Sequence, residues 1–282
     1  MVAKVISGRE VAETILTTDL KNKVIELNKK NIKPKLIVIL VGDMKASASY
    51  VAQKEKFAVK AGIESDVMRF EDSTTETEIL DQIDAINKDK SIHGVIVQLP
   101  LPDHISVAKV LNRIDPSKDV DGFTPTNVGK LFLGEDTLVS CTPKGIMQML
   151  ASTGTDLNGK NVTVVGRSNI VGKPVAILCL QQNATVTMCH SRTKDLNAKL
   201  ADADVVIVAV GIPKFISGDQ IPSDSIVIDV GIHNIDGKLC GDVDFESASQ
   251  KASAITPVPG GVGPMTVCAL IENTILAAER IG

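Results

Sequence analysis

The sequence predicts an α/β protein of two domains, each built on a parallel β-sheet. Apolar runs that end in glycine or proline alternate with amphipathic helical stretches, which is typical of strands and helices in this class. A stretch rich in Pro, Gly, Asp and Thr interrupts this series near the middle of the chain, and a second series follows it. The length of 282 residues suits two domains better than one.

The first series begins with "KLIVILVG", an apolar run closed by glycine that indicates a buried parallel strand. A helical stretch over about 46–61 follows, and "SDVMRF" predicts a second strand. The segment "ETEILDQIDAINKD" places Ile79, Ile83 and Ile86 on one face of a helix. A third strand, "HGVIVQLPLP", ends in two prolines, and "ISVAKVLNRI" predicts another helix.

The second series follows the loop "IDPSKDVDGFTPTNVG" and a linking helix at "TPKGIMQMLASTG". Its strands are expected at "NVTVVG", "ATVTMCH", "ADVVIVAVG" and "SIVIDVG", with helices between the first three. The final helix is expected at "PMTVCALIENTILAAER". The boundary between the domains therefore falls near residues 120 to 145.

Composition excludes several classes of protein. Acidic and basic residues are interspersed and the net charge is −4, which argues against nucleic acid as a partner. No apolar run approaches the roughly 20 residues of a membrane span, and the N-terminus turns polar early, so we expect a cytoplasmic protein. The 5 scattered cysteines predict reduced thiols, and the 4 histidines lack metal-ligand spacing, so no structural metal is expected.

A dinucleotide site is indicated by "NVTVVGRSNIVGKPVAILCLQ", which reads as a strand, a glycine turn and a helix. Only Gly166 and Gly172 remain of the usual glycine fingerprint, with Arg167 and Ser168 between them. An ordinary turn between a strand and a helix is the alternative on this stretch alone.

The next strand favours NADP over NAD. NAD sites usually carry an acidic residue at the end of that strand, which binds the ribose 2′-hydroxyl. "TVTMCHSRT" has none and offers His190, Ser191 and Arg192 instead. Arginine binds a 2′-phosphate, whereas a carboxylate would repel it. A solvated loop arginine is the alternative for Arg192.

The single tyrosine of the chain, Tyr50, stands four residues before Lys54 in "SYVAQKEKF". This spacing puts both side chains on one face of a helix, and for an isolated pair a plain surface helix is the more common explanation. Short-chain reductases also use Tyr-x-x-x-Lys, but their glycine turn precedes the pair. Here Gly166 follows it, which argues against that class.

Three further segments carry polar side chains or glycine-rich backbone that could bind a ligand. Gln98 lies at the carboxyl end of a predicted parallel strand in "IVQLPLP", where open α/β sheets bind ligands. Asp119 and Asp121 follow in "PSKDVDGF". The loop "TPVPGGVGPMT" lets a ligand approach its backbone closely, because it is rich in glycine. Each segment alone also fits a strand end, a turn or a helix entry.

Taken in order, ten strings resemble the bifunctional methylenetetrahydrofolate dehydrogenase/methenyltetrahydrofolate cyclohydrolases. They are "SASYVAQKEKFAVKAGI", "GVIVQLPLP", "PSKDVDGF", "CTPKGIM", "GRSNIVGKP", "ATVTMCHSRT", "ADVVIVAVG", "VIDVGI", "GDVDF" and "TPVPGGVGPMT", and they span nearly the whole chain. One departure is Ser140, where the family usually has proline.

The resemblance implies an N-terminal α/β folate-binding domain over 1–140 and a Rossmann-like NADP-binding domain over 141–263, with the helix 264–282 packing back onto the first. It implies a homodimer acting on tetrahydrofolate derivatives. NADP would oxidise 5,10-methylenetetrahydrofolate to the methenyl compound, and water would then open this to 10-formyltetrahydrofolate. A dehydrogenase without the second activity and a catalytically silent NADP sensor are the alternatives.

The resemblance also implies roles for individual residues. Lys54 matches the catalytic lysine, Tyr50 the aromatic ring on the folate, Gln98 the amide beside the lysine and Asp121 the carboxylate that holds the pterin. The expected substrate-binding set adds neighbours of Gln98 and the glycine loop: Leu99, Pro100, Pro259, Gly260, Gly261 and Gly263. The expected cofactor-binding set is Gly166, Arg167, Ser168, Gly172, His190, Ser191, Arg192 and Ile232.

Overall fold

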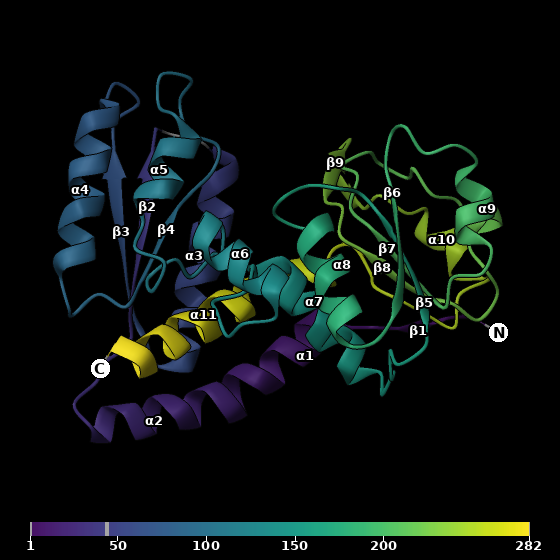
Figure 1. The fold of residues 1–282 in the computed structure, drawn as a ribbon, viewed down its shortest axis with the longest axis horizontal. Helices are drawn as coiled ribbons and strands as arrows, with labels where there is room; N and C mark the ends of the chain where they lie inside the picture. Colours follow the sequence, from purple (N-terminus) through teal and green to yellow (C-terminus); the bar gives the residue numbers. More distant parts are fainter. Residues whose placement is uncertain (1, 43–44, 282) are drawn as a thin grey trace. The chain divides into compact units, whose positions relative to one another are not determined.

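The computed structural model describes the backbone of residues 2–42 and 45–281, and the side chains of residues 45–51 lie outside this description. The chain divides into two compact units, which we name by their main sheets (Figure 1). The six-stranded unit comprises Met1–Ala12 and Thr142–Thr266. The three-stranded unit comprises Glu13–Cys141 and Val267–Gly282. Each unit therefore combines two separate stretches of the sequence.

The three-stranded unit contains a parallel sheet in the order β3-β2-β4. Its strands are β2 (Lys35–Val41), β3 (Glu64–Phe70) and β4 (Gly94–Val97). The central strand, β2, comes first in the sequence, and β3 and β4 pair with its two opposite edges. The strand order therefore reverses between β2 and β4. In open parallel sheets, ligands bind beyond the carboxyl ends of the strands at such a reversal.

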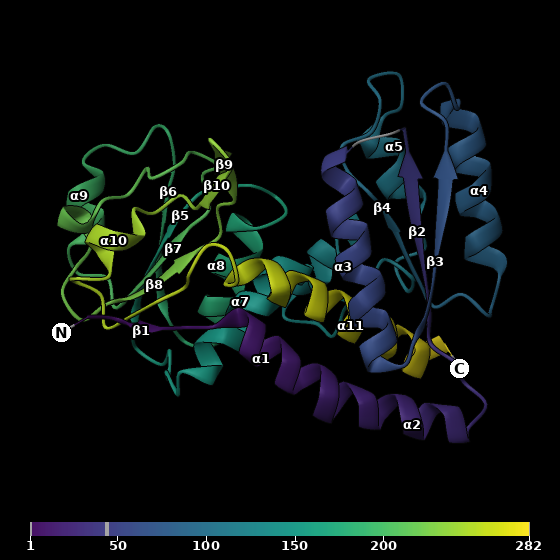
Figure 2. The ribbon, with the colours of Figure 1, turned by 180° about the vertical axis from the view of Figure 1, so that it is seen from behind.

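Helices cover both faces of this sheet (Figures 1 and 2). On one face, α4 (Glu76–Lys88) packs with α5 (Val107–Arg113), and Ile79, Ile83 and Ile86 of α4 are buried as their spacing predicts. A capping box of Thr75 and Glu78 begins α4. On the other face lies α3 (Lys45–Ala61), which buries Phe57, Ala58 and Ala61 near its C-terminal end.

The unit's remaining helical segments are η1 (Leu16–Leu20), α2 (Lys21–Lys29) and α6 (Pro125–Leu133). Three helices begin in one unit and end in the other: α1 (Gly8–Ile15), α7 (Cys141–Ser152) and α11 (Val262–Ile281).

The six-stranded unit contains a second parallel sheet, in the order β1-β11-β8-β7-β5-β6. Its strands are β1 (Lys4–Val5), β5 (Asn161–Val165), β6 (Thr185–Cys189), β7 (Val205–Val208), β8 (Ile226–Asp229) and β11 (Ala254–Ile255). The strand order reverses between β5 and β7, because β6 pairs with the edge of β5 opposite to the one that pairs with β7. A ligand crevice is expected beyond the carboxyl ends of these two strands.

Short elements complete this unit. They are α8 (Gly172–Gln181), α9 (Leu196–Leu200), η2 (Gly218–Gln220), α10 (Phe245–Ala248) and an antiparallel hairpin of β9 (His233–Ile235) and β10 (Lys238–Cys240). All four residues of β7 are buried, which explains why this strand reads as a continuous apolar run.

The α/β class and the parallel sheets are confirmed, but the N-terminus differs from the predicted division at residue 140. β1 pairs with β11 in the six-stranded unit, with Lys4 opposite Ala254 and Val5 opposite Ile255. A two-residue strand held by backbone hydrogen bonds leaves no periodic pattern in the sequence, and its partner is far away along the chain. Among the described residues, none of the helices has the length and apolar character that crossing a bilayer requires.

Candidate active site

Lys54 and Gln98 form a hydrogen-bonded pair in the three-stranded unit. Gln98 directly follows β4, and its backbone nitrogen donates to the carbonyl of Ile39 in β2 at 2.8 Å, which fixes the residue at the reversal point of the sheet. The Nζ of Lys54, from α3, donates to Oε1 of Gln98 at 2.8 Å. The Nε2 of Gln98 donates to the carbonyl of Leu99 at 2.9 Å, so the amide oxygen faces the lysine.

This geometry suits a lysine that takes up a proton. A neutral amine keeps two hydrogens, so Lys54 can still donate to Gln98 while its lone pair stays available. Burial lowers the pKa of Lys54, although the negative charge of Asp121 acts to raise it. Burial likewise raises the pKa of Asp121, against the charge of Lys54 and together with that of Asp119. Because burial dominates both shifts, the site favours the neutral forms of both groups more than water does.

The structure separates the roles of the two neighbouring aspartates. Asp119 is buried and accepts hydrogen bonds from the backbone nitrogens of Phe123 at 3.2 Å and Thr124 at 2.7 Å. The Nδ2 of Asn127 donates to it as well, at 2.9 Å. Asp119 therefore shapes the loop. Asp121 is the carboxyl group whose charge acts on Lys54.

Two residues that the sequence analysis did not single out support Asp121. The buried thiol of Cys141 donates to the carbonyl of Val120, the residue before Asp121, at 3.1 Å, and its interaction with the Asp121 side chain acts to lower the pKa of that carboxyl group. The Nδ2 of Asn273, from α11, donates to the carbonyls of Val120 at 2.9 Å and Val139 at 2.8 Å. Asn273 is fully buried, and it joins the segment that carries Asp121 to the one that carries Cys141. The only sequence signal for Cys141 was its place in "CTPKGIM".

The remaining predicted residues of this group are only partly described. Leu99 is partly buried and Pro100 is exposed, directly after Gln98. Tyr50 lies in α3 one turn before Lys54, but its side chain is outside the described residues. Lys56 lies on an exposed part of the same helix.

The glycine turn of the six-stranded unit is built by close backbone contacts. Gly166 has a φ of 136°, and a Cβ there would lie 2.3 Å from the carbonyl oxygen of Ala209. A Cβ on Gly172 would lie 2.4 Å from the oxygen of Gly166. The hydroxyl of Ser168 accepts from the backbone nitrogens of Val171 at 3.1 Å and Gly172 at 3.3 Å, and thereby helps to begin α8. The turn thus presents a helix N-terminus, which favours an anion such as a pyrophosphate.

The loop after β6 lies beside this turn, because Gly166 donates its backbone nitrogen to the carbonyl of Cys189 at 2.9 Å. His190 forms a tight turn with Thr193, and its Nδ1 accepts from the backbone nitrogen of Arg192 at 3.1 Å. Ser191 and Arg192 are exposed at its tip. Their hydroxyl and guanidinium groups fit a phosphate.

The predicted folate loop and Ile232 lie together in the six-stranded unit. Gly260 has a φ of 101° and accepts from the backbone nitrogen of Arg9 at 3.0 Å, directly after the exposed Pro259. Gly261 is buried, and a Cβ on it would lie 2.5 Å from the oxygen of Pro257. A Cβ on Gly263 would touch Cδ1 of Ile232 at 3.4 Å. The Ile232 side chain is 45% exposed, so it is open to a ligand beside this loop.

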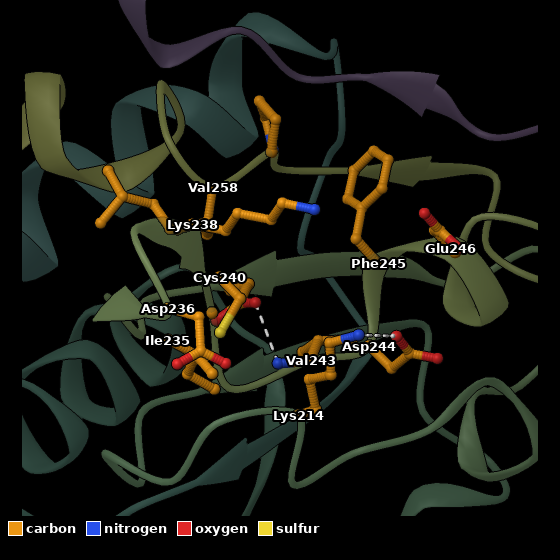
Figure 3. A pocket seen from close by; sticks show the side chains of 14 residues that line it. Lys214, Ile235, Asp236, Lys238, Cys240, Val243, Asp244, Phe245, Glu246 and Val258 are labelled. Carbon is orange, nitrogen blue, oxygen red and sulfur yellow. Dashed lines mark hydrogen bonds and ion pairs between the residues drawn. The ribbon is translucent and has the colours of Figure 1, made fainter. Parts of the chain in front are cut away.

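A pocket of about 540 Å³ lies elsewhere in this unit (Figure 3). Its wall includes Lys238, Cys240 and Phe245, and none of the predicted site residues lines it.

The predicted site residues therefore fall into two groups. Lys54, Gln98, Leu99, Pro100 and Asp121 belong to the three-stranded unit, and the glycine turn, the loop after β6, Ile232 and the loop 259–263 belong to the six-stranded unit. Within the described part of the chain, no group of three or more His, Cys, Asp or Glu side chains could hold a metal ion.

Comparison with known proteins accounts for nearly the whole chain. Residues 6–121 match the catalytic domain of tetrahydrofolate dehydrogenase/cyclohydrolase, and residues 140–281 match its NAD(P)-binding domain. The chain is 54% identical to the bifunctional protein FolD of Bacillus subtilis (strain 168) over 281 residues, covering 99% of both chains.

Solved structures agree with these matches. The bifunctional FolD enzyme of Campylobacter jejuni superposes with a TM-score of 0.96 at 45% identity, over 99% of both chains. The FolD dehydrogenase-cyclohydrolase of Trypanosoma brucei, complexed with NADP cofactor and inhibitor, superposes with a TM-score of 0.93 at 36% identity and covers 99% of this chain and 98% of that one.

These matches confirm the resemblance that the sequence strings carried, the α/β class with a nicotinamide-nucleotide domain, and the paired dehydrogenase and cyclohydrolase activities. The chain belongs to the tetrahydrofolate dehydrogenase/cyclohydrolase family.

Proposed function

We propose that Lys54, oriented by Gln98 and coupled to Asp121, is the acid–base group of an NADP-dependent methylenetetrahydrofolate dehydrogenase that is also a methenyltetrahydrofolate cyclohydrolase. The observation that carries this proposal is the 2.8 Å bond from Lys54 to Gln98, together with the burial that lowers the pKa of the lysine. The reactions are oxidation of 5,10-methylenetetrahydrofolate to the methenyl cation and hydrolysis of this cation to 10-formyltetrahydrofolate.

The second reaction needs a base. Water adds to the methenyl carbon and the bond from that carbon to N5 breaks; of the two protons of the water, one ends on N5 and the other must leave. Neutral Lys54 takes this proton, while Gln98 holds the amine in place. A cationic substrate beside Lys54 disfavours the ammonium form further, because like charges repel.

The other residues of this group position the substrate. Asp121 accepts hydrogen bonds from the pterin, Tyr50 packs its ring against the pterin ring, and Leu99 and Pro100 extend the surface beyond Gln98. In the six-stranded unit, the loop containing Pro259, Gly260, Gly261 and Gly263 would offer backbone groups to a folate.

NADP is the cofactor, and it accepts the hydride in the first reaction. Residues of the six-stranded unit fit it. Close backbone contacts at Gly166 and Gly172 exclude any side chain from the turn that would receive the pyrophosphate, beside Arg167 and Ser168. The exposed Arg192 and Ser191, together with His190, fit the 2′-phosphate, because no acidic residue ends β6. Ile232 would lie near the nicotinamide end.

We assign folate chemistry to the three-stranded unit and NADP binding to the six-stranded unit. We further infer a cytoplasmic homodimer that binds neither nucleic acid nor membranes, in keeping with the net charge of −4. Sedimentation equilibrium of the purified protein tests the dimer.

One assay tests the function. Absorbance of methenyltetrahydrofolate is followed first with methylenetetrahydrofolate and NADP, and then with the methenyl compound and no cofactor. Formation in the first arm and decay in the second are expected. Formation without enzymatic decay would indicate a dehydrogenase alone, and activity in neither arm would indicate a silent NADP-binding protein.

A further inference from the structure

Asp242 joins two loops at the carboxyl end of the six-stranded sheet. It follows β10 and is completely buried. Its Oδ2 accepts from the backbone nitrogens of Val210 at 2.7 Å and Gly211 at 2.9 Å, in the loop that follows β7. Its Oδ1 lies 2.7 Å from Nε2 of His233. Since a carboxylate only accepts, His233 donates, and one side chain satisfies three donors.

A second buried aspartate fixes Asp242. Asp229 ends β8, and its two oxygens accept from the backbone nitrogens of Asp242 at 2.8 Å and Val243 at 2.9 Å. It also accepts from the backbone nitrogen of Gly231 at 3.0 Å. Asp229 and Asp242 thus form an aspartate pair in which the first holds the backbone of the second.

The neighbouring glycines show how closely this pair is packed. A Cβ on Gly231 would lie 2.3 Å from Oδ1 of Asp242, and a Cβ on Gly241 would lie 1.9 Å from Oδ2 of Asp229. Any side chain at either position would displace a carboxylate. This explains the glycines of "VIDVGI" and "GDVDF", for which the sequence alone offered no reason.

The loops held by the pair border the predicted dinucleotide crevice. The strand order reverses between β5 and β7, and Gly166 of the glycine turn lies against Ala209, the residue before Val210. The pyrophosphate is expected at this turn, and Arg192 marks the 2′-phosphate on the β6 side. The nicotinamide end must therefore extend over the β7 and β8 side.

We propose that Asp242, held by Asp229, is a positioning residue for the nicotinamide half of NADP. It fixes the Val210–Gly211 loop and the segment Gly231–His233, which carries Ile232, in the arrangement that the dinucleotide meets. The inference rests on the NADP-dependent function proposed above.

The test compares Asp242→Asn with the unaltered enzyme. Asparagine is nearly isosteric, but its NH₂ group would face a donor, either His233 or the two backbone nitrogens. The KM and the Kd for NADP are expected to rise about tenfold or more, while the cyclohydrolase rate without cofactor stays unchanged. That split separates a positioning role from general loss of structure. Asp202→Asn, an exposed aspartate of the same unit, is the matched control.

The outcomes separate the two proposals. Absence of NADP-dependent oxidation in the unaltered enzyme refutes the proposed function. Oxidation by that enzyme with NADP binding unchanged in Asp242→Asn overturns the positioning role alone.

If Asp242→Asn does not fold, His233 decides the question. His233→Leu removes one donor and leaves both backbone bonds to Asp242, so a rise of severalfold in the Kd for NADP is expected, with cyclohydrolase activity retained. His233→Gln restores a donor and should recover most of the affinity. Equal affinity for NADP in His233→Leu and the unaltered enzyme refutes the role.

Discussion

Replacing Lys54 by glutamine should separate the two activities. The amide of glutamine cannot take up a proton, whereas Lys54 is partly buried, holds a lowered pKa and lies 2.8 Å from its orienting partner. Hydration of the methenyl cation needs that proton acceptor. Hydride transfer makes no such demand, so Lys54→Gln should retain some dehydrogenase activity and accumulate the methenyl intermediate, provided that Tyr50 still holds the ring.

The expected loss in cyclohydrolase rate is about 10²–10⁴-fold, the usual contribution of a general base. It corresponds to roughly 3 to 5 kcal/mol of barrier height. Folding should not suffer, because burial already disfavours the charged form of this lysine. Thermal unfolding of the variant checks this point before any rate is compared.

Two further variants sharpen the result. Lys54→Arg keeps a positive charge but cannot act as a base, so it should lose hydration as Lys54→Gln does. Lys56→Gln alters an exposed lysine on the same helix and should be nearly neutral. Near-normal hydration in Lys54→Gln would show that another group is the base, and equal losses at Lys54 and Lys56 would point to damage to the helix.

Three other outcomes follow from the same sites. Arg192→Ala should weaken NADP binding by about tenfold to a hundredfold and leave NAD binding nearly unchanged, because only NADP carries the phosphate; equal losses in titrations with both cofactors would refute the assignment. The cyclohydrolase rate without cofactor should rise with pH and level off above the pKa of Lys54, which burial places below 10.5, because only the unprotonated amine is a base; a flat profile would contradict this. Gly172→Ala places a Cβ 2.4 Å from a backbone oxygen and should raise the Kd for NADP about tenfold; unchanged affinity in calorimetry would show that the turn is not the pyrophosphate site.

The sequence predicted the elements whose burial is either periodic or continuous. The buried Ile79, Ile83 and Ile86 identify α4 because each helical turn repeats the pattern, and the apolar runs identify β2 and β7 because parallel strands are covered on both faces. It did not predict β1 or the β9–β10 hairpin, which have two or three residues per strand and are defined by backbone pairing.

The candidate site was likewise predicted only in part from the sequence. Lys54, Gln98 and Asp121 stood out by residue type and by the family strings, and the structure joins Lys54 to Gln98. The difference between Asp119 and Asp121 depends on which donors surround each carboxyl group, and two residues in one loop give no sign of that in sequence. Asn273 and Asp242 act through backbone atoms of distant segments. No motif marks Asn273, and the string "GDVDF" contains Asp242 without indicating its role.

The discontinuous build of the three-stranded unit bears on how the chain is made. Asn273 bonds the carbonyls of Val120 and Val139, which precede it by 153 and 134 positions. The ribosome adds about 5–20 residues per second. Asn273 is therefore synthesised on the order of ten seconds after the loop that carries Asp121. Until α11 has been synthesised, this loop lacks its buried polar partner and a chaperone has time to engage the nascent chain. Translation order therefore delays completion of the catalytic loop until α11 has been made.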